Sequence, residues 1–249
     1  MKSWLPLALF ALAVAAMLVH GPIPQHARYH EFADTRTFLA IPNAADVLSN
    51  AAFALVGIWG LLALRQRGRA LVTDPVLRGY ALFLLALLLT ALGSSFYHLA
   101  PDNGRLVWDR VPIALACAAL LAAAHAETRN PAQPAWVPLA LVAGAIASVG
   151  WWFFTESRGA GDLRPYLLLQ GAPLVLVPLW QHFAKAPRAG RIAFAIAILL
   201  YAFAKAAEIG DRAIFDALGW ISGHTLKHLL AAAAGAVIAA YAVPAYRKR

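Results

Sequence analysis

Long apolar runs separated by short polar segments make up almost the whole chain. After residue 45 they fall at about residues 47–64, 76–97, 111–126, 136–154, 167–183, 192–207 and 220–241. These lengths are close to the roughly 20 residues that a helix needs to cross the apolar core of a bilayer. The pattern predicts an all-α integral membrane protein in which residues 46–249 form a bundle of seven transmembrane helices.

A further apolar segment covers residues 1–20, with Lys2 near its start. Its length lies between that of a cleaved signal segment and that of a short membrane helix, and we favour a retained N-terminal transmembrane helix. Residues 21–45 are polar and are expected to form an extracytoplasmic link between this segment and the bundle.

The composition agrees with a membrane domain. Hydrophobic residues make up 61% of the chain and charged residues 13%, whereas soluble domains have about 25% charged residues. The net charge of +9 comes from Lys and Arg in short loops. These form no continuous basic face, so we expect no nucleic-acid partner. The single cysteine, Cys117, lies in an apolar run, which excludes a disulfide framework and a cysteine-based metal site.

The basic residues also predict the orientation. They gather in loops at 65–78 and 185–191 and at the chain end, 247–249. Positively charged loops stay in the cytoplasm, so the C-terminus is expected there. Alternation then places the loops around Asp102, Arg158 and Asp211 on the extracytoplasmic side.

Two histidines, His224 and His228, stand four residues apart at the head of the last span. On a helix they share one face, one turn apart, which allows two imidazoles to bind one metal ion. This spacing alone is more often fortuitous. Ionisable groups at the head of a membrane span are costly, however, so a functional interpretation is favoured.

The predicted topology brings His98 and Asp109 to the same side, because one ends its span and the other begins the next. Three imidazoles and one carboxylate at similar depth match a catalytic zinc site, which has three protein ligands and an open position for water. Asp109 is a candidate fourth ligand, ligand partner or general base, and the alternative is an ion pair with Arg105 or Arg110.

Ser94 lies four residues before His98 and therefore one turn deeper on the same face. Its hydroxyl is a candidate partner for a metal-bound water or an oxyanion, and the alternative is a bond back to its own helix. Asp46, Ser49 and Asn50 also share a face, which we expect to look into the protein. Helix capping explains one of these three at most.

Other ionisable residues fit simpler interpretations. His125 and His182 lie at the cytoplasmic ends of their spans, about a membrane thickness from the candidate site. Lys205 and Glu208 have the spacing of an ion pair within one helix, with a head-group role as the less favoured alternative.

The motif residues resemble the alkaline ceramidase family, in the superfamily of seven-helix membrane hydrolases that includes the adiponectin and progestin receptors. The resemblance covers about residues 30–240. It rests on Ser94-x-x-x-His98, on Asp109 eleven residues later, on His224-x-x-x-His228 in the final helix, and on Asp46-Val47-Leu48-Ser49-Asn50, which is similar to that family's Ser-Asn motif.

This resemblance implies a zinc-dependent amidase that cleaves ceramide into a sphingoid base and a fatty acid. It assigns zinc binding to His98, His224 and His228, and contact with the zinc-bound water to Ser94 and Asp109. In this mechanism the carboxylate takes a proton from the water and returns it to the leaving amine, while the serine helps to hold the oxyanion. The substrate would be a membrane lipid, ceramide or another N-acyl lipid, that enters sideways from the bilayer.

Two features depart from the family. Eukaryotic members carry an acidic, tryptophan-containing calcium site near the first core helix, whereas here Glu31, Asp34, Asn43 and Asp46 have a different pattern without tryptophan. Calcium is thus an open second cofactor beside zinc. The alanine-rich composition and short loops suggest a bacterial member in the inner membrane, with an extracytoplasmic active site and a lipid that need not be ceramide.

Two other classes of function stay open. A receptor-like or sensory seven-helix protein would hold zinc in a structural site, which four protein ligands close. A transporter or channel would place polar residues along the whole membrane depth, whereas here they gather at one side.

Overall fold

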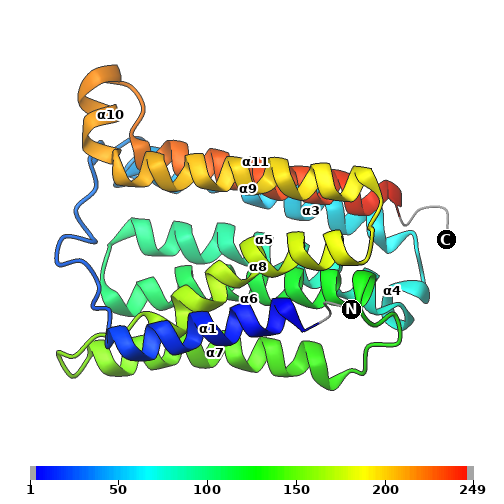
Figure 1. Ribbon diagram of the computed structural model, residues 1–249. Coiled ribbons are helices and arrows are strands. Elements are labelled where there is room, and N and C mark those ends of the chain that lie inside the picture. The colour runs from blue at the N-terminus through cyan, green and yellow to red at the C-terminus, as the bar shows by residue number, and fades with distance from the viewer. Residues whose placement is uncertain (1–3, 246–249) are drawn as a thin grey trace.

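The computed structural model describes residues 4–245, so Lys2 and residues 247–249 lie outside the described part of the chain. Long helices pack side by side (Figure 1), and the described residues form no β-strand beyond an isolated bridge between Phe38 and Ile41. The helices are α1 (Leu5–His20), α2 (Ala44–Ser49), α3 (Ala51–Arg65), α4 (Ala70–Thr73), α5 (Pro75–Leu99), α6 (Asn103–Thr128), α7 (Trp136–Glu156), α8 (Arg164–Phe183), α9 (Arg188–Ile209), α10 (Asp211–Leu218) and α11 (Gly223–Ala245).

The expected all-α membrane bundle is confirmed. Within residues 4–245, six helical segments are long and apolar enough to cross a membrane, and the first of them joins α2 to α3. The span expected at 167–183 is the helix α8, but its three prolines and its Gln and His residues keep it outside this set of six. The number of seven spans therefore stays a prediction, as does the fate of the first apolar segment.

The two ends of the bundle differ in charge. The link 21–43 and the short helix α10 lie at one end of the bundle, and α4 lies at the other (Figure 1). The arginine-rich loop before α4 and the loop from α8 to α9 share the second end, whereas Asp102 and Asp211 belong to the first. The separation of charge agrees with the predicted topology, and the sidedness in a membrane stays a prediction.

Glycines allow α5 and α6 to approach closely along their length. A Cβ atom at Gly79 would lie 2.7 Å from the Cβ of Ala123, and one at Gly93 would overlap the carbonyl oxygen of Trp108. Small residues at such contacts let membrane helices pack backbone against backbone. The second contact lies beside Asp109 and fixes α6 against the part of α5 that carries Ser94 and His98.

Capping side chains set the starts of the helices that carry the site. Asp102 accepts a hydrogen bond from the Arg105 backbone N–H at 2.8 Å, so α6 begins at Asn103 rather than at residue 111 as expected. Asp109 consequently lies in the second turn of α6. Ser222 accepts from the Thr225 N–H at 3.0 Å, and α11 begins at the next residue instead of at 220.

Candidate metal centre

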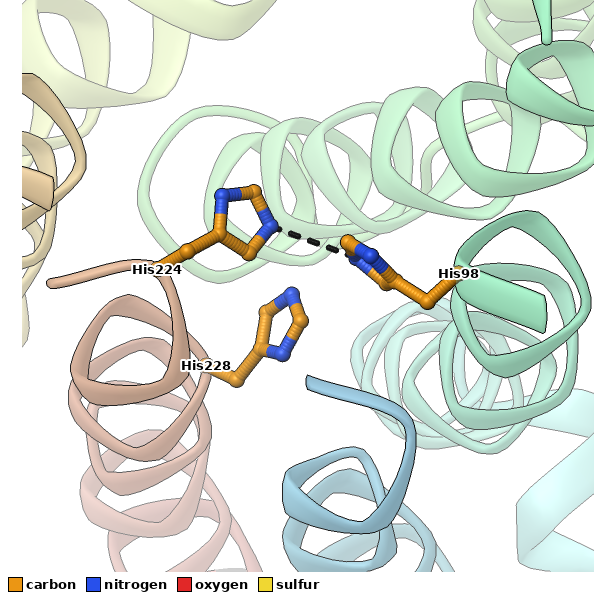
Figure 2. A group of neighbouring side chains, drawn as sticks. All are labelled: His98, His224 and His228. Carbon is orange, nitrogen blue, oxygen red and sulfur yellow. Dashed lines mark hydrogen bonds between the residues drawn. The ribbon is translucent and has the colours of Figure 1, made fainter. Parts of the chain in front are cut away.

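Three histidines converge where the end of α5 meets the start of α11. His98 is the last residue but one of α5, and His224 and His228 stand one turn apart on α11. One ligand atom from each lies within 4.8 Å of the others. Figure 2 shows the three rings turned towards one another from the two helices. All three are buried, so the expected meeting of these histidines is confirmed.

One distance in this group matches that expected around a tetrahedral zinc ion. The Nε2 atoms of His98 and His224 are 3.2 Å apart, and two nitrogens bound tetrahedrally to one zinc ion at about 2.0–2.1 Å are about 3.4 Å apart. Imidazole nitrogens suit zinc well, but they also suit copper, iron and nickel. The donor set therefore supports a transition-metal site, and the identity of the metal belongs to the proposal below.

The hydroxyl of Ser49 fixes the tautomer of His228. Ser49 donates to the carbonyl oxygen of Asp46 at 3.0 Å, and its oxygen lies 2.8 Å from Nδ1 of His228. A hydroxyl has one proton to donate, so Nδ1 must be the donor in the second bond. The proton then sits on Nδ1, and Nε2 keeps a free lone pair for a metal. The inward-facing position expected for Ser49 thus has a specific role.

Two carboxylates hold the first turn of α11. Asp46, fully buried as expected for its face of α2, accepts a hydrogen bond from the Thr225 hydroxyl at 2.6 Å. Asp211 accepts from the His224 backbone N–H at 2.7 Å and from the Ala33 N–H at 2.9 Å. These bonds tie α2, α10 and the polar link to the helix that carries two of the histidines.

Phe32 in the polar link covers the histidines. Its ring centroid lies 4.6 Å from that of His98 and 4.6 Å from that of His224, and the side chain is buried. The link turns inward there because Arg36 neutralises the buried carboxylate of Asp34 at 2.7 Å and lowers its pKa. Sequence analysis did not identify Phe32, because an apolar residue in an irregular segment gives no periodic signal.

Ser94 and Asp109 line a cavity of about 200 Å³ beside His228. Both side chains are buried and they interact with each other. The alternative ion pair of Asp109 is absent from the described residues: Arg105 pairs with Asp102 at 3.6 Å, and Arg110 packs 3.9 Å from the centre of the Trp152 ring. The Asp109 carboxylate is therefore available to the cavity.

Most of the cavity wall is apolar and extends along the helices away from the histidines. It includes Phe53, Phe83, Leu87, Ile113, Phe194 and Ile238, and also the single cysteine, Cys117. A polar end beside a long apolar wall matches a molecule with a polar group and a hydrocarbon chain.

Two lysines complete the polar end of the cavity. Lys205 and Lys227 both line it, and Glu208 contacts Lys205 at 2.7 Å and Lys227 at 3.0 Å. The pair between Lys205 and Glu208 within α9 is confirmed. The contact of Glu208 with Lys227 was not predicted, because Lys227 lies on α11 and the sequence gives no signal for a contact between distant helices.

Two of the other histidines have hydrogen-bond partners away from the metal centre. His30 contacts the Tyr97 hydroxyl at 2.8 Å and Asn103 at 3.0 Å, and His125 contacts Gln133 at 2.7 Å. Among the described residues, the three histidines of the centre are the one His, Cys, Asp and Glu group placed to hold a metal ion.

Comparison with known proteins adds no relative. No protein-family model, curated protein or solved structure matches the chain. The functional interpretation therefore rests on the residues of the site.

Proposed function

We propose that the protein is a zinc-dependent hydrolase of a lipid amide, with ceramide as the first substrate to test and a sphingoid base and a free fatty acid as products. The observation that carries this proposal is a group of three buried histidines, one of which, His228, lines the polar end of an apolar cavity together with Ser94 and Asp109.

His98, His224 and His228 would hold the zinc ion. When bound, zinc supplies Lewis acidity, which polarises a carbonyl and makes water more acidic. The group of ligand atoms contains three histidines and excludes Asp109 among the described residues. Three protein ligands are typical of catalytic zinc sites, whereas structural sites are closed by four. This count favours a hydrolase over the receptor-like alternative.

Asp109 is the general base of the proposed mechanism. Its carboxylate accepts a proton from the water that attacks the amide carbonyl carbon. As the C–N bond breaks, the carboxylic acid returns this proton to the amine nitrogen, so the aspartate is regenerated. The Ser94 hydroxyl donates a hydrogen bond to the carbonyl oxygen as negative charge develops there. The apolar wall holds the acyl chain and keeps bulk water away.

The test is release of fatty acid from ceramide by the purified protein in detergent, beside Asp109→Asn. Loss of a positioned general base lowers the rate by about 10²–10⁴-fold, and we expect this loss with zinc content unchanged. The matched control is Asp102→Asn, which alters an exposed cap at the start of the same helix. A zinc-loaded parent that cleaves neither ceramide nor other N-acyl lipids would contradict the proposal and favour the receptor-like alternative.

A further inference from the structure

The group Lys205, Glu208 and Lys227 has more hydrogen-bond donors than its protein partners use. Each ammonium has three N–H donors, and each forms one short contact, to a different oxygen of the same carboxylate. Neither ammonium has another hydrogen-bond acceptor among residues 4–245. Four donors thus stay available at the wall of the cavity.

The same group also carries an excess of positive charge. One carboxylate lies between two ammonium groups, and charges in a largely apolar cavity are costly unless they are paired. Asp109 is the one carboxylate among the described residues that line the cavity, and no ion pair within 4 Å joins it to either lysine. An anionic ligand would supply both the missing acceptors and the missing charge.

The position of the lysines indicates which part of a substrate they meet. Lys227 and His228 line the same cavity, so the ammonium charge lies near the proposed reaction centre, and the apolar wall extends away from it. If the acyl chain follows this wall and the amide carbonyl lies near Asp109, the group beside the lysines belongs to the amine half of the substrate.

We propose that Lys205 and Lys227, held in place by Glu208, bind a carboxylate or phosphate on the amine half of the lipid amide. This inference rests on the proposed function and narrows its substrate class to N-acyl lipids with an anionic head group, such as N-acyl amino acids. A neutral head group accepts hydrogen bonds but leaves the ammonium charge uncompensated, and charge-assisted bonds are about twice as strong as neutral ones.

The test compares the binding of two ligands that differ in head-group charge. N-palmitoylglycine is anionic and N-palmitoylethanolamine is neutral, and Asp109→Asn as the background prevents turnover during calorimetric titration in detergent. We expect a preference of about tenfold for the anionic ligand. Lys227→Met should abolish this preference and leave the affinity for the neutral ligand within about twofold.

Two further variants make the result specific. Lys205→Met changes a partly exposed side chain and should also reduce the preference, so the test does not depend on the folding of one variant. Lys185→Met removes the same charge from an exposed position outside the cavity and should leave the preference intact.

Equal affinity for the two ligands, or a preference that both cavity variants retain, would overturn the inference. Palmitate provides a further arm: if its binding depends on the lysines as strongly as that of N-palmitoylglycine, they hold the acyl carboxylate, and the head-group assignment is wrong. Because this readout is binding, a lysine-dependent preference in a protein that cleaves no amide would contradict only the proposed hydrolysis. Loss of the preference in an active amidase would contradict only the inference.

Discussion

Buried polar side chains occur at both ends of the bundle, but their partners differ. At the end with α4, Glu127 accepts hydrogen bonds from the hydroxyls of Tyr80 and Tyr241, and His125 contacts the Gln133 amide. At the opposite end, three histidines direct ligand atoms at one another beside a cavity. The first group is satisfied by its own members, whereas the second has its ligand atoms gathered at one point. Convergence of lone pairs, rather than burial of polar groups, therefore distinguishes the candidate site.

The largest difference between the ends should appear when one histidine is removed from each. His98→Ala deletes one of three proposed ligands. Even the loss of a residue that only hydrogen-bonds to a ligand lowers metal affinity by about 10–100-fold, so we expect zinc affinity to fall by at least about 100-fold. His125→Ala is the matched control and should bind zinc like the parent. Competition with a zinc-binding dye measures both, and equal affinities in the two variants would remove the distinction between the ends.

A smaller loss of zinc affinity should follow when the hydrogen-bond partner of a proposed zinc ligand is removed. Ser49→Ala deletes the acceptor for Nδ1 of His228, so the ring is no longer held in the metal-binding tautomer, and we expect about 10–100-fold weaker zinc binding. Ser95→Ala is the control, because the hydrogen bond of this hydroxyl goes to the Val47 carbonyl, at 3.2 Å, and not to a histidine. Competition with the zinc-binding dye measures the zinc affinity of both variants. A Ser49 variant with the affinity of the parent would show that the hydroxyl does not orient the ring.

At the opposite end, a substitution should affect stability rather than metal binding. Glu127→Gln removes the charge that accepts hydrogen bonds from Tyr80 and Tyr241. Hydrogen bonds to charged groups contribute about 1.5–3 kcal/mol each and neutral ones about 0.5–1.5 kcal/mol, so loss of the charge from two bonds should lower the free energy of unfolding by about 2 kcal/mol with zinc affinity unchanged. Denaturant titration in detergent measures the first quantity. Weaker zinc binding in this variant would show that the two ends are coupled.

The smallest effect is expected at Asp162, before α8. Its carboxylate pairs with Arg164 at 2.8 Å and accepts from the Trp151 indole N–H at 2.9 Å. The hydrogen bond from Arg164 is the main cause of its lowered pKa. A carboxyl with a lowered pKa stabilises the fold above its ordinary pKa of 3.8 and loses this contribution as the pH falls through the folded value.

Asp162→Asn should therefore cost about 1 kcal/mol of unfolding free energy at neutral pH, because asparagine loses the charge but keeps one acceptor oxygen. The cost should shrink as the pH falls below 3.8, because the carboxyl of the unfolded parent is then protonated before that of the folded parent. The free energies of unfolding of the parent and of Asp162→Asn, measured at neutral pH and below pH 3.8, test this. A cost that is the same at both would show that the ion pair does not contribute.

Hydropathy predicted the long helices because membrane spans are uniformly apolar over many residues. It did not predict α10, which is a short amphipathic helix between two spans. It also placed the start of α6 too late, because charged and polar residues interrupt the first two turns, Asn103 to Asp109, and the start depends on the Asp102 cap.

Part of the metal centre could also be predicted from patterns in the sequence. Helical spacing places His224 above His228, and the order of the spans brings His98 to the same end. The positions of Phe32 and Lys227 could not be predicted, since one lies in an irregular link and the other meets Glu208 on another helix. Such contacts depend on the packing of distant segments, which no local pattern encodes.

The central claim is that three histidines bind a zinc ion. The most direct measurement is the zinc content of the purified, detergent-solubilised protein, prepared without chelator, beside His228→Ala. The account predicts about one zinc ion per chain in the parent, as three convergent ligands bind one ion, and a large loss in the variant. A folded parent that contains no metal, or a variant that retains the full amount, would contradict it.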